Sequence, residues 1–407
     1  MKKINGGVTA AAGFEASSAA AQIKYKGRTD MALVYSKAPC TVGGTFTTNV
    51  VKAAPVIWDR EIVRSGKSVH AVIVNSGIAN ACTGQEGLGY CRETAKAAAE
   101  ALDIPEESVL VGSTGVIGMQ LPIDRIKKGV VMLAQAREAT LEAGTAAACA
   151  IMTTDTHKKE IACVEEIGGV TVTIGGMCKG SGMIHPNMCT MLGYVTTDLA
   201  ISHEMLQKAV SDVVRDSFNM ISVDGDTSTN DTFLVLANGL AGNAPITEEN
   251  EDYKKFHAVL KDVCTHLAME MAGDGEGATK LIESRVLHAD TDANARILAK
   301  AVITSSLTKA AVYGNDANWG RVLCALGYSG ASFDPENVDL YFAGGDRKIL
   351  IFTKGSAADY SEEEATQILK GEKVEIISDM HMGEASAVAW GCDLTHEYVS
   401  INADYRS

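Results

Sequence analysis

Residues 178–198 read CKGSGMIHPNMCTMLGYVTTD, near the middle of a chain of 407 residues. Glycines on both sides of Ser181 permit a sharp backbone turn, and Pro186 cannot continue a helix, so residues 178–187 are predicted to form a loop. From Met188 onward the residues are mostly apolar or β-branched, which predicts a buried strand. Thr190 is therefore expected at the beginning of a buried strand, directly behind a glycine-rich loop.

Thr190 has two interpretations in this position. In the first it is an ordinary residue on the face of a sheet, where β-branched side chains are common. In the second its hydroxyl attacks the carbonyl of Cys189, the resulting ester is hydrolysed, and Thr190 becomes a new N-terminus. The freed α-amine, whose ordinary pKa is about 7.7–8.0, can then take the proton from the hydroxyl of the same residue.

The stretch resembles the ArgJ family, the ornithine acetyltransferases (glutamate N-acetyltransferases), in which a similar run contains the threonine of a self-cleaving precursor. The resemblance extends from Gly6 to Ser407 and covers several separate loops. It implies a layered α/β fold of the ArgJ and DmpA group, reminiscent of N-terminal-nucleophile hydrolases. It also implies cleavage between Cys189 and Thr190 into an α chain, 1–189, and a β chain, 190–407, assembled as two α and two β chains. Cys189 replaces the alanine that is usual in the family.

The composition excludes several classes of partner. A formal net charge of −15 leaves no basic surface for a nucleic-acid backbone or an anionic membrane. The 10 cysteines lack the spacing of a zinc site, so no metal is predicted, and free thiols indicate the reducing cytoplasm. The first residues lack the apolar core of a signal peptide, and no stretch is long and apolar enough to span a bilayer.

Strand and helix patterns alternate along the chain, which is typical of an α/β protein. Strands are predicted at 31–36, 69–75, 108–111, 233–237, 338–353 and 374–402, with a second strand after the glycines at 43–44 and a hairpin over 161–174. Helices are predicted at 85–103, 123–149, 204–218, 250–271 and 290–308. The alanine-rich segment 9–22 is predicted to be a loop or a short helix.

Two of the predicted strands end in small, polar, glycine-containing loops, at 75–84 and 112–118. Such loops can be plain connections, but glycine backbone N–H groups with an adjacent threonine hydroxyl also suit an oxyanion hole. The resemblance implies that Thr114 and Gly115 stabilise the oxyanion. The acidic run 222–232 lacks the glutamate of a calcium-binding EF-hand loop. The resemblance implies that this run is a polar loop near the site.

The resemblance also implies a set of substrate-binding residues. The matching positions are Thr153 or Thr154, Lys179, Glu276, Asn402 and Ser407, in addition to Thr190. Lys179 would bind a substrate carboxylate, and Glu276 the ammonium group of ornithine, which is a chemically sensible pairing. Without the resemblance, the threonines could form only a helix cap and turn, Lys179 would be a solvated charge, and the C-terminal residues a frayed tail. Glu276, which lies among glycines, has little local reason to be structural.

Together these features predict a self-processing acetyltransferase that moves the acetyl group of N2-acetylornithine to glutamate, releasing ornithine. The reaction would pass through an acetyl-threonyl enzyme and need no metal or organic cofactor. Acetyl-CoA as a second acetyl donor stays open. Two alternatives remain: a DmpA-like aminopeptidase or amidase that passes the acyl group to water, and a non-catalytic binding protein whose chain stays intact.

Overall fold

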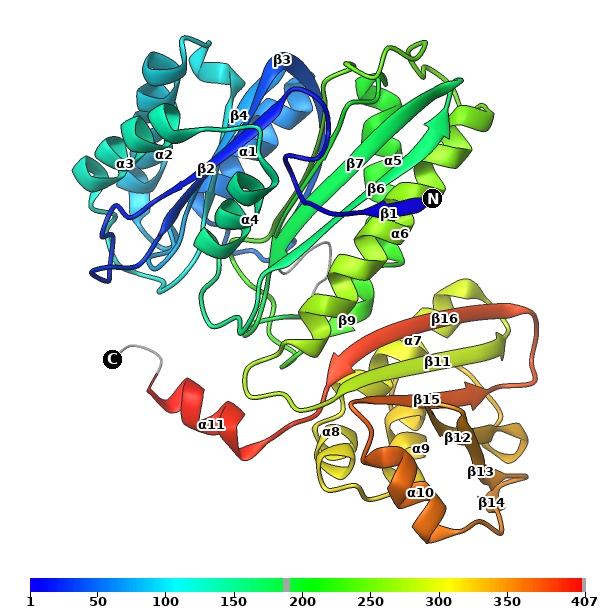
Figure 1. The fold of residues 1–407 in the computed structure, drawn as a ribbon. Coiled ribbons are helices and arrows are strands. Elements are labelled where there is room, and N and C mark those ends of the chain that lie inside the picture. The colour runs from blue at the N-terminus through cyan, green and yellow to red at the C-terminus, as the bar shows by residue number, and fades with distance from the viewer. Residues whose placement is uncertain (186–190, 405–407) are drawn as a thin grey trace. The chain divides into compact units, whose positions relative to one another are not determined.

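A computed structural model describes residues 1–185 and 191–404 of the chain (Figure 1). The chain divides into two compact units. Unit 1 comprises Met1–Gly180, Pro186–Asn219 and Thr227–Leu267, and unit 2 comprises Ser181–His185, Met220–Asp226 and Ala268–Ser407. These boundaries differ from those of the predicted α and β chains, because they reflect packing and not a covalent cut. The predicted cleavage site, Cys189 and Thr190, and the terminal Ser407 lie outside the described residues.

Unit 1 contains, among its described residues, a nine-stranded sheet in the order β1-β6-β7-β8-β10-β3-β4-β5, with β2 paired to β3. The strands are β1 Lys2–Ile4, β2 Phe14–Ala19, β3 Met31–Phe46, β4 Val69–Asn75, β5 Val109–Ser113, β6 Lys159–Ile167, β7 Val170–Lys179, β8 Leu192–Thr197 and β10 Thr232–Ala237. The helices are α1 Ala54–Ser65, α2 Gly84–Leu102, α3 Ile123–Ala136, α4 Leu141–Ala150 and α5 His203–Arg215. Helix α6, Glu251–Gly273, continues from unit 1 into unit 2.

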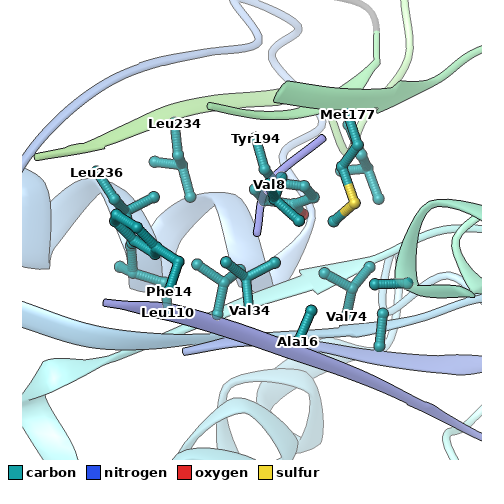
Figure 2. Close-up of a cluster of buried hydrophobic side chains, with 14 of the residues drawn as sticks. Val8, Phe14, Ala16, Val34, Val74, Leu110, Met177, Tyr194, Leu234 and Leu236 are labelled. Carbon is teal, nitrogen blue, oxygen red and sulfur yellow. The ribbon is translucent and has the colours of Figure 1, made fainter. Parts of the chain in front are cut away.

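Strand β3 belongs to two halves of this sheet. Its first residues pair with β2 and β4, whereas its last residues pair with β10. The two halves face each other, and Figure 2 shows the core between them, where Val34, Val74 and Leu110 lie opposite Tyr194 and Leu234. Burying each such large apolar side chain stabilises the fold by about 1.5–3 kcal/mol. The sheet sandwich therefore fixes how the ends of β4, β5, β8 and β10 are placed.

Helices cover both outer faces of the sandwich. Helices α2 and α3 enclose a second core against β4 and β5, which includes Ala95, Leu102 and Val130. On the other face, α5 packs on β3 at Gly43, where a Cβ atom would lie 3.1 Å from the side chains of both Leu206 and Val210. The result is a layered α/β arrangement, so the predicted fold class is confirmed.

Unit 2 contains, among its described residues, a seven-stranded sheet in the order β14-β13-β12-β15-β11-β16-β9. The strands are β9 Ile221–Ser222, β11 Leu281–Ala289, β12 Asp339–Gly344, β13 Arg347–Thr353, β14 Ser356–Ala357, β15 Lys373–Asp379 and β16 Ala385–Cys392. The helices are α7 Asp292–Thr304, α8 Ser306–Tyr313, α9 Trp319–Gly327, α10 Glu362–Leu369 and α11 His396–Ala403. In the described residues, no helix has the length and apolar character needed to cross a membrane.

Five local predictions were wrong. The helix predicted over 290–308 is interrupted at Ser305, which is extended and separates α7 from α8. Segment 9–22 contains strand β2, and the glycines at 43–44 lie inside β3, not in a turn. The helix predicted over 123–149 is two helices, α3 and α4, because Glu138 leaves the helix to form a β-bridge with Ala16. The strand pattern predicted to continue to Asn402 ends at Cys392, and Asn402 lies on α11.

Candidate functional site

The predicted oxyanion loop follows β5 in unit 1, and it packs directly on the loop that follows β4. The backbone N–H of Thr114 donates to the carbonyl of Asn75 at 3.0 Å. Gly115 has φ +129°, and a Cβ atom on it would lie 2.3 Å from the carbonyl carbon of Gly77. Only glycine has room there and adopts this conformation without strain. The structure thus joins the two polar loops, while the oxyanion role of Thr114 and Gly115 stays a prediction.

A third loop, which precedes β10, holds this pair in place. The side-chain amide of Asn230 donates to the carbonyl of Ser113 at 2.9 Å. The hydroxyl of Ser113 donates to the carbonyl of Ile78 at 3.1 Å and accepts from the backbone N–H of Asn80 at 2.9 Å. All of these groups are buried, so each hydrogen bond replaces one that water would otherwise supply. The polar run 222–232 was predicted to lie near the site, and its part in unit 1, residues 227–231, adjoins the predicted oxyanion loop.

Substitution of Gly115 by alanine is expected to lower the rate of acetyl transfer about 10²–10³-fold, the usual cost of losing one oxyanion donor. The added Cβ atom would push the loops after β4 and β5 apart, because both contacting groups are backbone. Gly118→Ala is the matched control, since Gly118 also has positive φ, +84°, but a Cβ atom there would meet nothing within 4 Å. Initial rates of both variants test this, and equal rates would contradict it.

Asp155, which was not among the predicted site residues, links the segments of two predicted binding residues of unit 1, Thr153 and Lys179. One carboxylate oxygen accepts from the backbone N–H of Thr153 at 3.0 Å. The other accepts from the ammonium group of Lys159 at 2.8 Å and from the backbone N–H of Gly180 at 2.9 Å. The segment that carries Thr153 is therefore tied to the residue that follows Lys179.

The charge of Asp155 is balanced by lysines. Burial alone would raise the pKa of Asp155, but the charges of Lys179 and Lys159 and the hydrogen bond from Gly180 outweigh it and lower that pKa. Lys179 is the last residue of β7, is 7% exposed and pairs across the sheet with Leu192 of β8. It therefore lies beside the beginning of the strand that follows Thr190. Thr153 and Thr154 are both partly buried, and the structure does not distinguish between them as substrate ligands.

Asp231 is a second buried carboxyl that the sequence reasoning missed. The backbone N–H of Met191, the residue after Thr190, bonds to this carboxyl. Burial raises the pKa of Asp231 well above its ordinary value, against hydrogen bonds from Ser228, Thr47 and Met191 and the charge of Lys179. Its Oδ2 atom has no hydrogen-bond partner among the described residues. A buried acid thus lies next to the residue that follows the predicted nucleophile.

In unit 2, Glu276 and Asn402 lie together. The side-chain amide of Asn402 donates to the carboxylate of Glu276 at 2.7 Å, and Glu276 is 5% exposed. The backbone N–H of Glu276 donates to the carbonyl of Ser181 at 3.3 Å. A Cβ atom on Gly182 would lie 2.4 Å from the same carboxylate. The predicted ornithine-binding glutamate is thus held against the glycine-rich segment at Ser181 and Gly182.

The next residues of that loop are held by Asp224, also in unit 2. Its carboxylate accepts from the backbone N–H of Met183 at 2.6 Å and of Ile184 at 3.0 Å. The backbone N–H of Val223 donates to the carbonyl of Ile184 at 2.6 Å. Ser181 and Met183 have positive φ angles of +138° and +58°, which non-glycine residues adopt only where the surroundings enforce them. The segment that leads to the predicted cleavage site is therefore fixed up to Ile184.

One group of side chains in the described residues has the donors of a metal site, His288, Asp379 and His381 of unit 2. The two imidazoles lie 2.8 and 3.3 Å from the same carboxylate oxygen of Asp379. The sequence predicted no metal site, and none of these residues was predicted to be functional. No step of the reaction proposed below uses this group.

Comparisons with known proteins identify the family of this chain. The model of the ArgJ family matches residues 15–407. The arginine biosynthesis bifunctional protein ArgJ of Symbiobacterium thermophilum is 53% identical over 409 residues, covering 100% of both chains. The crystal structure of the arginine biosynthesis bifunctional protein argJ from Bacillus halodurans matches with a TM-score of 0.50 and 46% identity, covering 52% of this chain and 97% of that one.

An ornithine acetyltransferase of Mycobacterium tuberculosis, solved in complex with ornithine, is 42% identical, with a TM-score of 0.42, and covers 45% of this chain and 95% of that one. The family resemblance drawn from the sequence is thereby confirmed, since the family model and the full-length relative both cover nearly the whole chain. This chain belongs to the ArgJ family.

Proposed function

We propose that this chain moves the acetyl group of N2-acetylornithine to glutamate through an acetyl-threonyl enzyme at Thr190. The enzyme class, an acyltransferase of arginine biosynthesis, follows from the family. The observation that carries the mechanism is the arrangement in unit 1. There the loop of Thr114 and Gly115 meets the loop before β10, and Lys179 pairs with the beginning of β8.

In the first half of the cycle, the hydroxyl oxygen of Thr190 attacks the acetyl carbonyl carbon, and the α-amine of Thr190 accepts the hydroxyl proton. Negative charge then develops on the carbonyl oxygen, where Thr114 and Gly115 stabilise it. The bond to the nitrogen of ornithine breaks, and the amine returns the proton to that nitrogen. Ornithine leaves, and the acetyl group stays on Thr190 as an ester.

In the second half, the amine of glutamate attacks the ester carbonyl, and the same oxyanion donors stabilise the same charge. The α-amine of Thr190 takes the excess proton from the attacking nitrogen and passes it to the hydroxyl oxygen as the ester bond breaks. N-acetylglutamate leaves, and the enzyme is regenerated. No metal or organic cofactor takes part in either half of the proposed cycle.

The α-amine exists only after the bond between Cys189 and Thr190 has been cut. The proposal therefore includes self-processing into chains 1–189 and 190–407, which stay together as two α and two β chains in the cytoplasm. Support comes from the Bacillus halodurans structure, where a chain matched over 97% of its length covers only 52% of this one, as expected for one product of such a cut.

Substrate recognition follows from charge. Lys179 binds the α-carboxylate of the amino acid, Thr153 or Thr154 and Ser407 provide hydroxyls, and Glu276 with Asn402 binds the side-chain ammonium group of ornithine. We also propose acetyl-CoA as a second acetyl donor, since the full-length relative is named a bifunctional protein.

The direct test of the proposed function is the mass of the purified protein under denaturing conditions, before and after incubation with N2-acetylornithine. We expect two chains that meet at Cys189 and Thr190, and an added acetyl group on the second chain only. Addition of glutamate should remove that acetyl group and yield N-acetylglutamate. Release of acetate with no transfer to glutamate would instead identify a hydrolase, and an uncut chain without a bound acetyl group would contradict the proposal.

Replacement of Glu276 by glutamine is expected to raise the KM for N2-acetylornithine about 10–100-fold, because a hydrogen bond to a charged group contributes about 1.5–3 kcal/mol. Glutamine keeps the size of the side chain and can still accept from Asn402. Glutamate carries no side-chain ammonium group, so its KM serves as the internal control and should change little. Initial rates with each substrate varied in turn test this, and equal changes in both KM values would contradict it.

A further inference from the structure

Unit 1 has a cavity of about 640 Å³ that the acetyl-transfer mechanism does not use. It lies between α1, α5 and the C-terminal end of β3, and its polar lining includes Thr47, Lys52, Arg60, Arg64, His203 and Gln207. None of the residues that line it is acidic. This lining is unexpected in a chain whose formal net charge is −15.

No carboxylate in the described ranges, 1–185 and 191–404, forms an ion pair with the cations of the cavity. Arg60 and Arg64 are four residues apart on α1 and therefore lie on one face of the helix. Neither guanidinium has a hydrogen bond or an ion pair with any other residue in 1–185 or 191–404. Within the described part of the chain, Lys52 donates only to the backbone carbonyl of Asn49, at 2.7 Å. Three formal positive charges thus face one space, and none has a carboxylate partner among the residues that the structure describes.

The other side chains around the cavity are held in place. Gln207 of α5 donates to the carbonyl of Gly44 and accepts from the N–H of the same residue, both at 3.0 Å. The Nδ1 atom of His203 lies 3.0 Å from the carbonyl oxygen of Val42. Because a carbonyl only accepts, this nitrogen carries a hydrogen atom. The walls are therefore fixed, and the arginines and the lysine are the groups available to a ligand.

Charge and size together indicate the ligand class. Arginine guanidinium groups present paired N–H donors that match phosphate oxygens, and a phosphate group brings up to two negative charges. A volume of about 640 Å³ is that of a site for a whole cofactor or metabolite, far more than an isolated inorganic ion requires. We propose that this cavity binds the phosphate groups of a ligand of nucleotide size, with Lys52, Arg60 and Arg64 as its anion-binding residues.

The cavity has a direct connection to the candidate site. Thr47 forms part of its wall, and the backbone N–H of Thr47 donates to the carbonyl of Asp231 at 3.1 Å. The hydroxyl of Thr47 donates to the carbonyl of Ser228 at 2.8 Å. A ligand that contacts Thr47 therefore contacts the residue that holds the loop before β10.

Two sources share this phosphate chemistry. One is coenzyme A, which carries a diphosphate and a further phosphate, and this source rests on acetyl-CoA as the proposed second donor. The other is a free nucleotide that would act on the enzyme without entering the reaction. The anion site itself depends on neither, because binding can be measured without any acetyl transfer.

Isothermal titration calorimetry with inorganic pyrophosphate, coenzyme A and ATP tests the proposal on the full-length wild-type protein. We expect pyrophosphate to bind and to bind less tightly as the salt concentration rises. The double variant Arg60→Gln, Arg64→Gln should weaken binding of pyrophosphate, and of whichever larger ligand binds, by at least about tenfold. Tighter binding of coenzyme A than of ATP would assign the site to the acetyl donor, and the reverse order to a nucleotide.

Arg92→Gln is the matched control, because Arg92 is an exposed arginine of α2 outside the cavity lining and should not alter binding. Circular dichroism and thermal unfolding establish that both variants are folded. The proposal is overturned if the wild-type protein binds none of the three probes. It is equally overturned if the double variant binds them as tightly as the wild type and the Arg92→Gln control. A wild-type protein that binds pyrophosphate but does not transfer acetyl groups would count against the proposed function alone.

Discussion

Replacement of Thr190 by alanine is expected to leave the chain uncut and to abolish acetyl transfer. Alanine has no hydroxyl to attack the carbonyl of Cys189, so the α-amine that serves as the base never forms. It also has no oxygen to accept the acetyl group, so both halves of the cycle lose their nucleophile. We expect the transfer rate to fall on the order of 10⁴-fold or more, as for other enzymes that lose a covalent nucleophile.

The mass under denaturing conditions and the transfer rate are to be measured on the same preparations of wild-type protein, Thr190→Ala and Thr190→Ser. Serine keeps a hydroxyl and, once cleaved, an α-amine, so the serine variant should be cut and should transfer acetyl groups more slowly than the wild type. Thr190→Ala protein that is cut, or that transfers acetyl groups at nearly the wild-type rate, would refute the mechanism. So would a wild-type chain that remains whole while fully active.

Patterns of strands and loops were predictable where the residues themselves set the local conformation. Strand β4 and the polar loop after it, and the hairpin at Gly168 and Gly169, are as the sequence indicates. In these segments hydrophobic alternation and glycine act locally and agree with the packing around them. The same local signals placed Thr114 and Gly115 in a loop at the end of a strand.

Other segments take their structure from distant partners. The alanines and serines of β2 favour no strand by themselves, yet β2 pairs along its length with β3. The glycines at 43–44 suggest a turn, but in β3 they make room for α5 and for Leu234. Helix α11 follows a strand region, and its first turn is capped by Thr395, whose hydroxyl accepts from the N–H of Tyr398. Tertiary packing overrides local preference in β2 and β3, whereas the beginning of α11 is set by a local cap that the strand pattern concealed.

Two of the buried carboxyls of unit 1, Asp155 and Asp231, show the same limit at the candidate site. Asp155 and Asp231 lie in polar stretches that look like caps or loops in the sequence. Their burial, and their links to Gly180 and Met191, exist only once β7, β8 and β10 are side by side. A sequence pattern can indicate which residues are able to bind substrate. It does not show that the carboxyl groups of Asp155 and Asp231 hold the neighbouring segments in place.

Removal of the carboxylate of Asp155 is expected to destabilise unit 1 by about 3–5 kcal/mol, the usual cost of breaking a buried ion pair. The side chains of Asp155 and Lys159 are both 0% exposed, so Asp155→Ala breaks an ion pair that is fully buried. The backbone N–H groups of Thr153 and Gly180 lose their acceptor as well. Denaturant unfolding measures the loss. Glu251→Ala, which breaks an exposed ion pair with Lys254, is the control and should cost less than about 1 kcal/mol.

The pH dependence of the unfolding free energy distinguishes the contribution of the Asp155 charge from that of its packing. Because the pKa of Asp155 is lower in the folded protein than in the unfolded chain, its stabilising contribution is complete above the unfolded pKa. That contribution is lost as the pH falls through the folded pKa. The difference in unfolding free energy between wild type and Asp155→Asn, which keeps the side-chain size, should therefore be largest near neutral pH and shrink in acid. A difference that stays constant with pH would show that Asp155 acts by packing, and that its carboxylate does not position Thr153 and Lys179 through charge.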